Sequence, residues 1–195
     1  MTKLLFSILI TLFLFESAHS QKLEYDIVKG GKTIGSVLAI KKTVGDTTII
    51  TITSESKFKL LFSFNVSYFL EEKFIDDVLV SGNAVNYLNG NVQKSSSVQK
   101  SGNKYIVKLD DEVSEFNLNK ITYSITSIYF EQPPHLNITI FSQQFAEFLS
   151  MYHKPNNEYE LESENGNNNY FYQDGILDKV KVSRSYATFF FQRKK

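Results

Sequence analysis

The chain has no cysteine. Disulfide bonds are therefore impossible, and thiolate nucleophiles, cysteine-based zinc sites and iron–sulfur ligation are excluded. A bacterial lipoprotein is excluded as well, because lipidation requires a cysteine at the first position of the mature chain. Core packing alone must hold this fold together.

An excess of charge of either sign is also missing. The chain carries 21 basic and 21 acidic residues, for a formal net charge of zero. A neutral chain has no bulk attraction to nucleic acid or to an anionic membrane. Only two of the basic residues are arginine, which is the preferred side chain for bidentate binding of phosphate or carboxylate. We therefore expect no nucleic-acid partner.

Recognisable catalytic motifs are absent too. The sequence contains no G-x-S-x-G elbow, no H-E-x-x-H helix motif and no glycine-rich phosphate loop. His135 and His153 stand outside any known constellation, and the acidic clusters at 76–77 and 110–112 lie beside turns, where exposed carboxylates are common. We predict a protein that is not an enzyme, with no catalytic residue, no metal ligand and no cofactor. The alternative is a hydrolase that uses a pair of carboxylates.

One acidic segment has a second interpretation. Glutamates alternate with other residues along 158–164, and asparagines follow at 165, 167 and 168. Oxygen-rich clusters of this kind bind Ca²⁺ in some proteins. Side chains in a row along one strand diverge, however, and no EF-hand spacing is present. A solvated strand face, paired across strands with Lys179 or Lys181, is the favoured interpretation.

The first twenty residues have the pattern of a secretory signal peptide. Lys3 precedes an apolar run from residue 4 to residue 15, and Ala18-His19-Ser20 places small residues three and one positions before a cleavage site. This run of twelve residues is too short for a membrane-spanning helix, which needs about 20. We predict cleavage after Ser20, a periplasmic or extracellular location, and no membrane span in the mature chain.

In the rest of the chain, apolar and polar residues alternate with a period of two. In the run from Phe58 to Leu70 every even position is apolar, while the odd positions are mostly Lys, Ser and Asn. A strand places alternate side chains on opposite faces, so this run predicts one buried and one wet face. Thirteen residues extend over ~43 Å, far more than the usual strand. We expect such a strand to bend or to contain a bulge.

Turn signals divide the chain at short intervals. Glycine, with asparagine or aspartate beside it, recurs between the alternating segments, most clearly at Asn89-Gly90 and Asp174-Gly175. The intervals leave no room for crossover helices, so the sheet should be an antiparallel meander. The predicted strands are 22–29, 33–43, 46–57, 58–74, 77–88, 92–100, 103–109, 112–118, 157–163, 168–173, 176–185 and 187–193. We predict an all-β fold whose strongly curved sheet forms a barrel or half-barrel.

The segment 119–155 interrupts this pattern. Ile121, Ile125 and Ile128 fall at helical spacing before Pro133-Pro134, and a second apolar set from Ile138 to Leu149 also fits a helical face. The β-branched residues at 138–140 make a mixture of strand and helix equally acceptable. We predict residues 21–195 to be a single β-rich domain with one or two short helices in this insertion.

Aromatic residues are plentiful, with 17 Phe and 11 Tyr in the chain. Large rings suit the pleated surface of a sheet, so core packing explains most of them. A curved sheet also offers a concave face on which surplus rings bind an apolar ligand. The inner register of the long alternating run selects the candidate ligand-binding residues Phe58, Phe62, Phe64 and Tyr68.

Two short patterns carry a family resemblance. Tyr25-Asp26-Ile27, followed by Gly30 and Ile34-Gly35, and a closing hairpin over 169–177 resemble an uncharacterised family of exported β-rich domains of Gram-negative bacteria. Such domains are similar in outline to the periplasmic lipoprotein-carrier half-barrels, in which a curved antiparallel sheet wraps helices. The resemblance implies a role in handling lipid or lipoprotein, and no catalytic residue is carried over.

Two functions follow from these observations. The first is a non-enzymatic envelope protein that binds a lipid-like ligand, such as an acyl chain, or an apolar segment of another envelope protein. The second is a structural or interaction module without a small-molecule ligand, in which the aromatic residues only form the core. An apolar cavity above roughly 300 Å³ would favour the first function.

Overall fold

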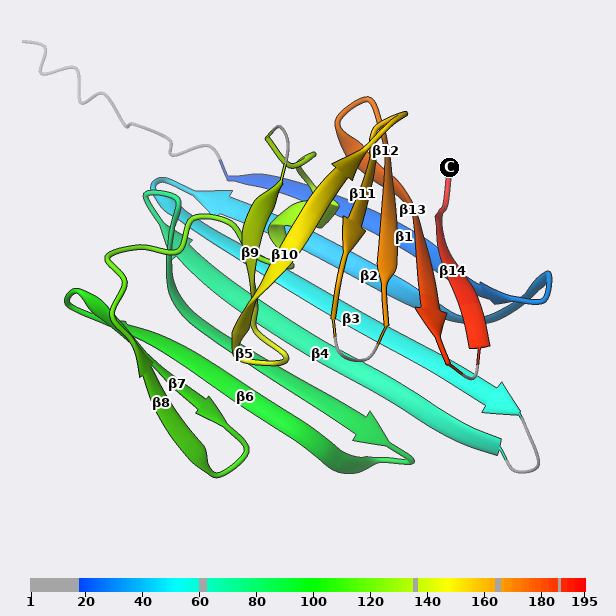
Figure 1. The fold of residues 1–195 in the computed structure, drawn as a ribbon, viewed down its shortest axis with the longest axis horizontal. Coiled ribbons are helices and arrows are strands. Elements are labelled where there is room, and N and C mark those ends of the chain that lie inside the picture. The colour runs from blue at the N-terminus through cyan, green and yellow to red at the C-terminus, as the bar shows by residue number, and fades with distance from the viewer. Residues whose placement is uncertain (1–17, 60–62, 135–136, 164–165, 186) are drawn as a thin grey trace, which may run out of the picture.

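The computed structural model describes residues 18–59, 63–134, 137–163, 166–185 and 187–195. Within these residues fourteen strands form one sheet (Figure 1). In chain order they are β1 (His19–Lys29), β2 (Lys32–Val44), β3 (Thr47–Lys59), β4 (Ser63–Ile75), β5 (Val78–Leu88), β6 (Asn91–Ser101), β7 (Lys104–Leu109), β8 (Glu112–Phe116), β9 (Ile138–Ser142), β10 (Glu147–Lys154), β11 (Glu158–Leu161), β12 (Asn168–Gln173), β13 (Ile176–Arg184) and β14 (Ala187–Arg193).

The sheet is an antiparallel meander in two runs. Strands β1 to β8 pair with their neighbours in sequence, as do β9 to β14, and β1 pairs with β14 to join the two runs. The predicted all-β class and antiparallel meander are confirmed. The ladder does not close into a barrel, because in the described residues its two ends, β8 and β9, are not paired with each other.

Tight turns stand where the turn signals predicted them. Asn89 and Gly90 have φ angles of 52° and 82°, and Asp174 and Gly175 have φ angles of 54° and 76°. Glycine reaches positive φ without steric cost, and asparagine and aspartate tolerate it better than most other residues. These residues fix the ends of β5, β6, β12 and β13.

The long strand predicted over 58–74 is wrong. Strand β3 ends at Lys59 and β4 begins at Ser63, and the two form a hairpin in which Phe58 pairs with Phe64. The connecting residues 60–62 lie outside the described part of the chain. Their sequence, Leu-Leu-Phe, contains none of the residues that mark tight turns, so the alternation ran through the hairpin without a break.

The helical character predicted for 119–155 is mostly wrong. The described residues of this segment contain one short 3₁₀ turn, η1 (Ser127–Tyr129), and the strands β9 and β10. The apolar residues from Ile138 to Leu149 therefore follow the strand interpretation. They reverse direction around Ala146, which has a φ of 54°.

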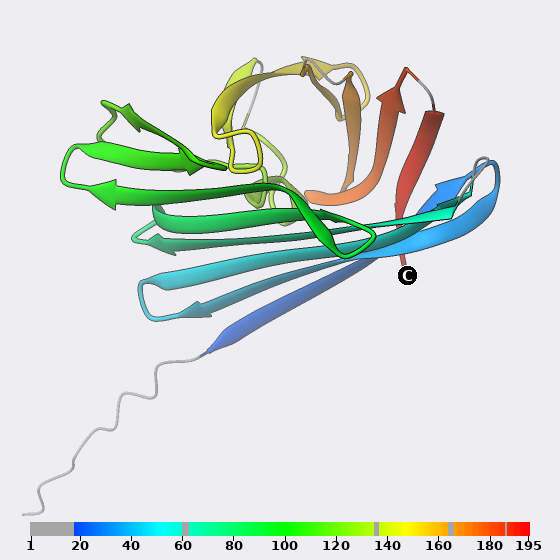
Figure 2. The ribbon, with the colours of Figure 1, turned by 90° about the horizontal axis from the view of Figure 1, so that it is seen from below.

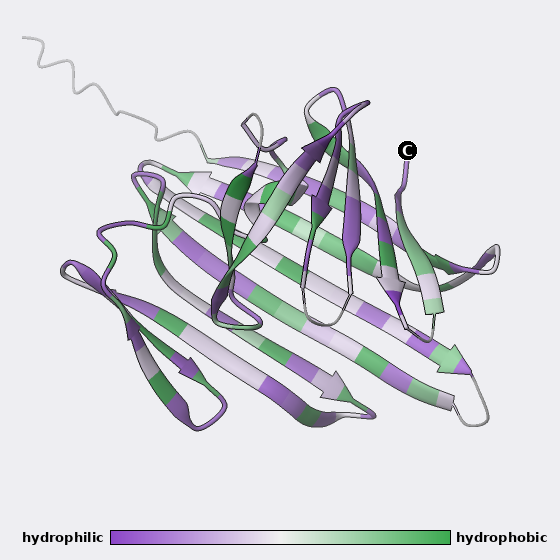
Figure 3. Cartoon of the chain, in the orientation of Figure 1, coloured by the Kyte–Doolittle hydropathy of each residue, from purple (hydrophilic) through white to green (hydrophobic). Residues whose placement is uncertain are grey.

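The two runs of the sheet enclose one core. Figure 2 shows β9 to β12 above the face of the long strands β1 to β5, with residues 118–131 between them. Along the strands, hydrophobic and hydrophilic residues alternate in bands (Figure 3). The inward set forms a single hydrophobic cluster that reaches from Tyr25 in β1 to Val182 in β13. We call residues 118–131 the strap.

The predicted leader meets the sheet at its first strand. Residues 1–17 lie outside the described residues, and His19 and Ser20 already pair with Thr43 and Lys42 of β2. Cleavage after Ser20 would remove these two residues from β1 and leave the ladder intact from Gln21 onward. No helix among the described residues is long and apolar enough to cross a membrane.

Candidate functional site

The structure brings two of the four predicted ligand-binding residues into contact. Phe58 and Phe64 face each other across the β3–β4 hairpin, with ring centres 6.0 Å apart and an interplanar angle of 26°. Phe62 lies outside the described residues. The fourth residue, Tyr68, is on the same face of β4, two residues before the buried Leu70.

Two further phenylalanines, which the sequence analysis did not select, extend this pair. Phe189 of β14 places its ring 5.9 Å from that of Phe58, and Phe191 lies 6.1 Å from Phe189. All four side chains are half-buried. We call Phe58, Phe64, Phe189 and Phe191 the phenylalanine cluster. The sequence signal for its second half was the run Phe189-Phe190-Phe191, but nothing local indicated that β14 lies near β3.

Tyr68 belongs to the interior and not to the cluster. Burial raises the pKa of its hydroxyl, and the neighbouring Glu72 and Tyr170 raise that pKa further. Tyr170 comes from β12, on the opposite side of the core. Tyr68 therefore lies where the two runs of the sheet face each other.

Most other buried tyrosines have structural roles. Tyr25 donates its hydroxyl hydrogen bond to Leu177 O over 2.9 Å, and Tyr172 donates to Ile128 O over 2.8 Å. Tyr105 donates to Leu79 O and accepts from the amide of Ile121, both over 2.9 Å. A buried phenol requires such a partner, and here each one ties two distant segments together. Core packing thus accounts for these rings.

The strap fills the space between the two runs. Ile121 and Ile128 on it are at most 3% exposed, and the Tyr129 ring packs edge-on against Tyr25 at 5.7 Å. Its backbone is bound at two points, because Leu79 donates to Ile121 O and Ile125 donates to Phe141 O. The core beside the strap is therefore solid.

A carboxyl group is buried beneath the strap. Glu72 of β4 is fully buried, and its Oε2 accepts hydrogen bonds from the hydroxyls of Ser124 and of Thr126, the latter over 2.5 Å. Burial raises the pKa of Glu72 to about 7, although both hydroxyls act to lower it. Sequence reasoning missed this residue. The alternation Leu70-Glu72-Phe74 places it on the inner face, but a glutamate is expected in water.

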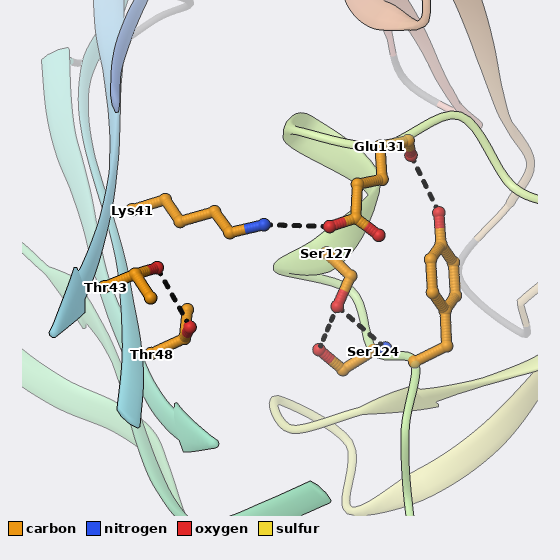
Figure 4. A network of polar contacts seen from close by, with 7 residues as sticks. Lys41, Thr43, Thr48, Ser124, Ser127 and Glu131 are labelled. Carbon is orange, nitrogen blue, oxygen red and sulfur yellow. Dashed lines mark hydrogen bonds and ion pairs between the residues drawn. The ribbon is translucent and has the colours of Figure 1, made fainter. Parts of the chain in front are cut away.

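A polar crevice lies between part of the strap and strands β2, β3 and β4. Figure 4 shows Lys41 reaching from the sheet to Glu131 on the strap, with 2.8 Å between Nζ and Oε1, while Ser127 contacts Ser124. The crevice has a volume of about 280 Å³ and is lined by Lys41, Thr48, Ile50, Phe74, Asp77, Thr122, Ser127 and Glu131.

A second cavity, of about 520 Å³, lies over β2, β3 and β4. Its lining is mainly polar: Ile34, Gly35, Ser36, Glu55, Ser56, Lys57, Asn65, Val66 and Ser67. Only glycine fits at position 35, since a Cβ atom there would lie 2.1 Å from Glu55 O. None of the predicted ligand-binding residues that the structure describes lines either cavity.

The glutamate row on β11 has partners other than those predicted. Asn169 donates to Glu158 over 2.9 Å, Asn167 donates to Glu160 over 3.0 Å, and Lys154 forms an ion pair with Glu160. Across the described residues, no group of three or more His, Asp or Glu side chains is arranged to hold a metal ion. The row is a hydrogen-bonded surface ladder.

Among the described residues, His153 and the acidic clusters show no arrangement typical of catalysis. The His153 ring packs on Tyr159 at 4.9 Å, and His135 lies outside the described residues. Asp76 and Asp77 have φ angles of 49° and 58° in a turn, and Asp110 accepts a hydrogen bond from the amide of Ser95. These acidic side chains therefore serve turns, and the absence of enzymatic activity stays a prediction.

Residues 25–194 match the family model of a domain of unknown function, DUF6134. The chain belongs to this family. The match extends from β1 to β14, so it covers both runs of the sheet, the strap and the phenylalanine cluster. The expected membership of a domain-of-unknown-function family is confirmed at this level. No functionally curated protein matches the chain.

A solved structure with a similar fold comes from Brucella abortus. It is described as a beta-barrel-like protein of the domain of unknown function DUF1849. It aligns with a TM-score of 0.58 over 89% of this DUF6134 chain and 95% of its own, at 10% sequence identity. Similarity at this level of identity concerns the fold alone.

Proposed function

We propose that this DUF6134 protein is a non-enzymatic, exported binding protein that holds an acyl chain or similar apolar group on the phenylalanine cluster. One observation carries the proposal. Four half-buried phenyl rings from β3, β4 and β14 contact one another on the inner side of the sheet. Contiguous apolar rings that keep part of their surface in water are typical of binding sites.

Phe189 and Phe191 of the cluster pack against the edge of the core, whereas Phe64 lies far from the strap. Phe64 precedes Glu72 by eight residues on β4, which corresponds to ~26 Å of extended strand. The strap contacts the sheet at Glu72 and Leu79, at the other end of these strands. An acyl chain would therefore lie on the rings at the cluster end and not inside an enclosed cavity. The polar linings of the two cavities support the same placement.

The rim of the cluster also carries a positive charge. Lys29 Nζ lies 5.8 Å from the centre of the Phe58 ring. An ammonium group at this distance from an aromatic face is favourably placed for a cation–π interaction. A ligand with an apolar chain and a terminal carboxylate would meet rings and a cation together, so a fatty acid is the preferred probe.

The proposal also includes the shape of the sheet and the export of the protein from the cytoplasm. We infer that the sheet acts as a half-barrel with the cluster at its open end; the barrel-like description of the Brucella protein supports the shape only. Export is supported by the leader pattern of residues 1–20. The second candidate, an interaction module without a ligand, is favoured by the solid packing of the strap.

The first test is a titration of delipidated protein with a fluorescent fatty-acid probe. We expect saturable binding at micromolar protein. Replacing Phe64 with serine should weaken it roughly tenfold or more, because an apolar contact of this size is worth ~1.5–3 kcal/mol. The matched control is Phe69→Ser on the opposite face of the same strand, where the ring is 36% exposed. This control should bind like the wild type.

Two results of the titration would contradict the proposed binding site. If the wild type shows no saturable binding, or if Phe69→Ser weakens binding as much as Phe64→Ser, the cluster is not the site. Circular dichroism of both variants checks that the strands are retained. Absence of binding by a folded wild type would favour the interaction module.

A further inference from the structure

Two buried oxygen atoms lack a hydrogen-bond donor at one point of the core. Glu72 Oε1 is one, since both hydroxyls of the strap bond to Oε2. The other is Oε1 of Gln143, which follows β9 and is fully buried. An unsatisfied buried acceptor costs free energy of folding, so a pair of them needs a physical explanation.

The side chains of Glu72 and Gln143 both border Gly82. A Cβ atom at Gly82 would lie 2.7 Å from Gln143 Oε1 and 3.1 Å from Glu72 Cγ. The orientation of the amide is set by its other atom, because Gln143 Nε2 donates to Ser96 Oγ over 3.2 Å. Rotating the amide would lose that bond. A proton on Glu72 Oε1 would turn this atom into a donor, and Gln143 Oε1 is the neighbouring acceptor that lacks one.

We propose that Glu72 is a pH-dependent latch: its neutral acid donates a hydrogen bond from Oε1 to Gln143 and holds the strap against β4, and its ionisation loosens the strap. The latch joins three segments, because Glu72 lies on β4, Ser124 and Thr126 lie on the strap, and Gln143 lies beyond β9. Ionisation would set two unsatisfied acceptors against each other in a fully buried site.

Among the described residues, no cation acts on the charge of Glu72. Its titratable neighbour is Tyr68 on β4, whose pKa the Glu72 charge raises. The strap presents hydroxyl groups, β5 presents Gly82, and the segment after β9 presents the Gln143 amide. Lys41, Asp77 and Glu131 line the crevice together with Ile50, the cross-strand partner of Glu72, and there Lys41 is paired with Glu131. Burial raises the pKa of Glu72 to about 7.

The sign of the effect follows from this pKa. Opening of the strap exposes Glu72 to water, where its pKa is 4.5. Between pH 4.5 and pH 7 the open state loses the proton and the closed state keeps it, so opening becomes more favourable as pH rises. Above pH 7 both states are ionised and the effect levels off. The opening constant should rise about 300-fold across this window.

Amide hydrogen exchange of the full chain measures this opening. The reporters are the amides of Leu79, Ile121 and Ile125, which bond to or from the strap. After correction for the intrinsic exchange rate, their protection should fall between pH 4.5 and 7 and stay level to pH 8. In Glu72→Gln, whose amide donates without a titratable proton, protection should be independent of pH. Glu71→Gln, on the opposite face of β4, should keep the wild-type profile.

Two results would overturn the latch. One is a wild-type protection profile that is flat with pH, and the other is a Glu72→Gln profile identical to that of the wild type. A titration of Glu72 followed by NMR tests the proposal on the wild type alone. The carboxyl ¹³C shift of Glu72 should titrate with a midpoint near 7, and a midpoint near 4.5 would also refute the proposal.

Discussion

Replacing Phe141 with alanine should lower the free energy of unfolding by about 3–5 kcal/mol, the usual cost of truncating a buried phenylalanine. Phe141 of β9 is fully buried, and its ring lies 6.4 Å from that of Phe116 at the end of β8. It therefore packs the two unpaired ends of the sheet against each other. Its backbone also bonds to the strap, through Ile125 N and Tyr123 O. Urea unfolding followed by circular dichroism measures the loss.

Phe148 provides the matched control for this prediction. Its ring lies 5.4 Å from Phe141 and 5.6 Å from Phe116, but the side chain is 36% exposed. Less apolar surface is buried there, so Phe148→Ala should cost clearly less than Phe141→Ala. Equal costs for the two variants, or a cost under about 1 kcal/mol for Phe141→Ala, would mean that the sheet ends are not packed as described.

Global stability should fall by about 3 kcal/mol as pH rises from 4.5 to 7, through Glu72 alone. The pKa of this carboxyl is raised from 4.5 in water to about 7 in the fold. Below pH 4.5 both states are protonated. Between 4.5 and 7 only the unfolded chain releases the proton, which favours unfolding. Above 7 both states are ionised and the contribution is constant.

Glu72→Gln isolates this contribution. The variant should match the wild type near pH 4 and exceed its stability at pH 8 by up to about 3 kcal/mol, as measured by urea unfolding at each pH. Glu71→Gln serves as the control for removing one carboxylate from β4. A difference between wild type and Glu72→Gln that stays constant from pH 4 to pH 8 would contradict the raised pKa.

Much of the sheet could be predicted because its turns are encoded locally. Asn89-Gly90 and Asp174-Gly175 adopt the positive φ angles that these residues favour, and strands on both sides begin and end within one or two residues of prediction. The hairpin between β3 and β4 shows the limit. Its connection is Leu-Leu-Phe, and apolar residues at a reversal give no local signal.

The strands β9 and β10 show a second limit. Their apolar residues fit helical spacing as well as strand spacing, and tertiary packing decides between the two. The reversal between them uses Ala146 at a φ of 54°, a conformation that alanine rarely adopts. The reversal contains no glycine, proline, asparagine or aspartate that would indicate a turn. The apolar spacing of the segment therefore favoured a helix.

The candidate site was predictable only in part, for a similar reason. Alternation placed Phe58 and Phe64 on one face, and the hairpin then brought their rings together. Phe189 joins them through the β1–β14 pairing, which links the two ends of the chain and has no local signature. Glu72 was missed because its partners Ser124 and Thr126 lie more than fifty residues further along the chain.

Native mass spectrometry of the protein purified from cells that export it tests binding on the phenylalanine cluster most directly. We predict a wild-type species that carries an acyl-bearing adduct. The adduct should be lost or strongly reduced in Phe64→Ser and retained in Phe69→Ser. A folded wild type without any such adduct, which also fails to bind the fatty-acid probe, would contradict the proposed function.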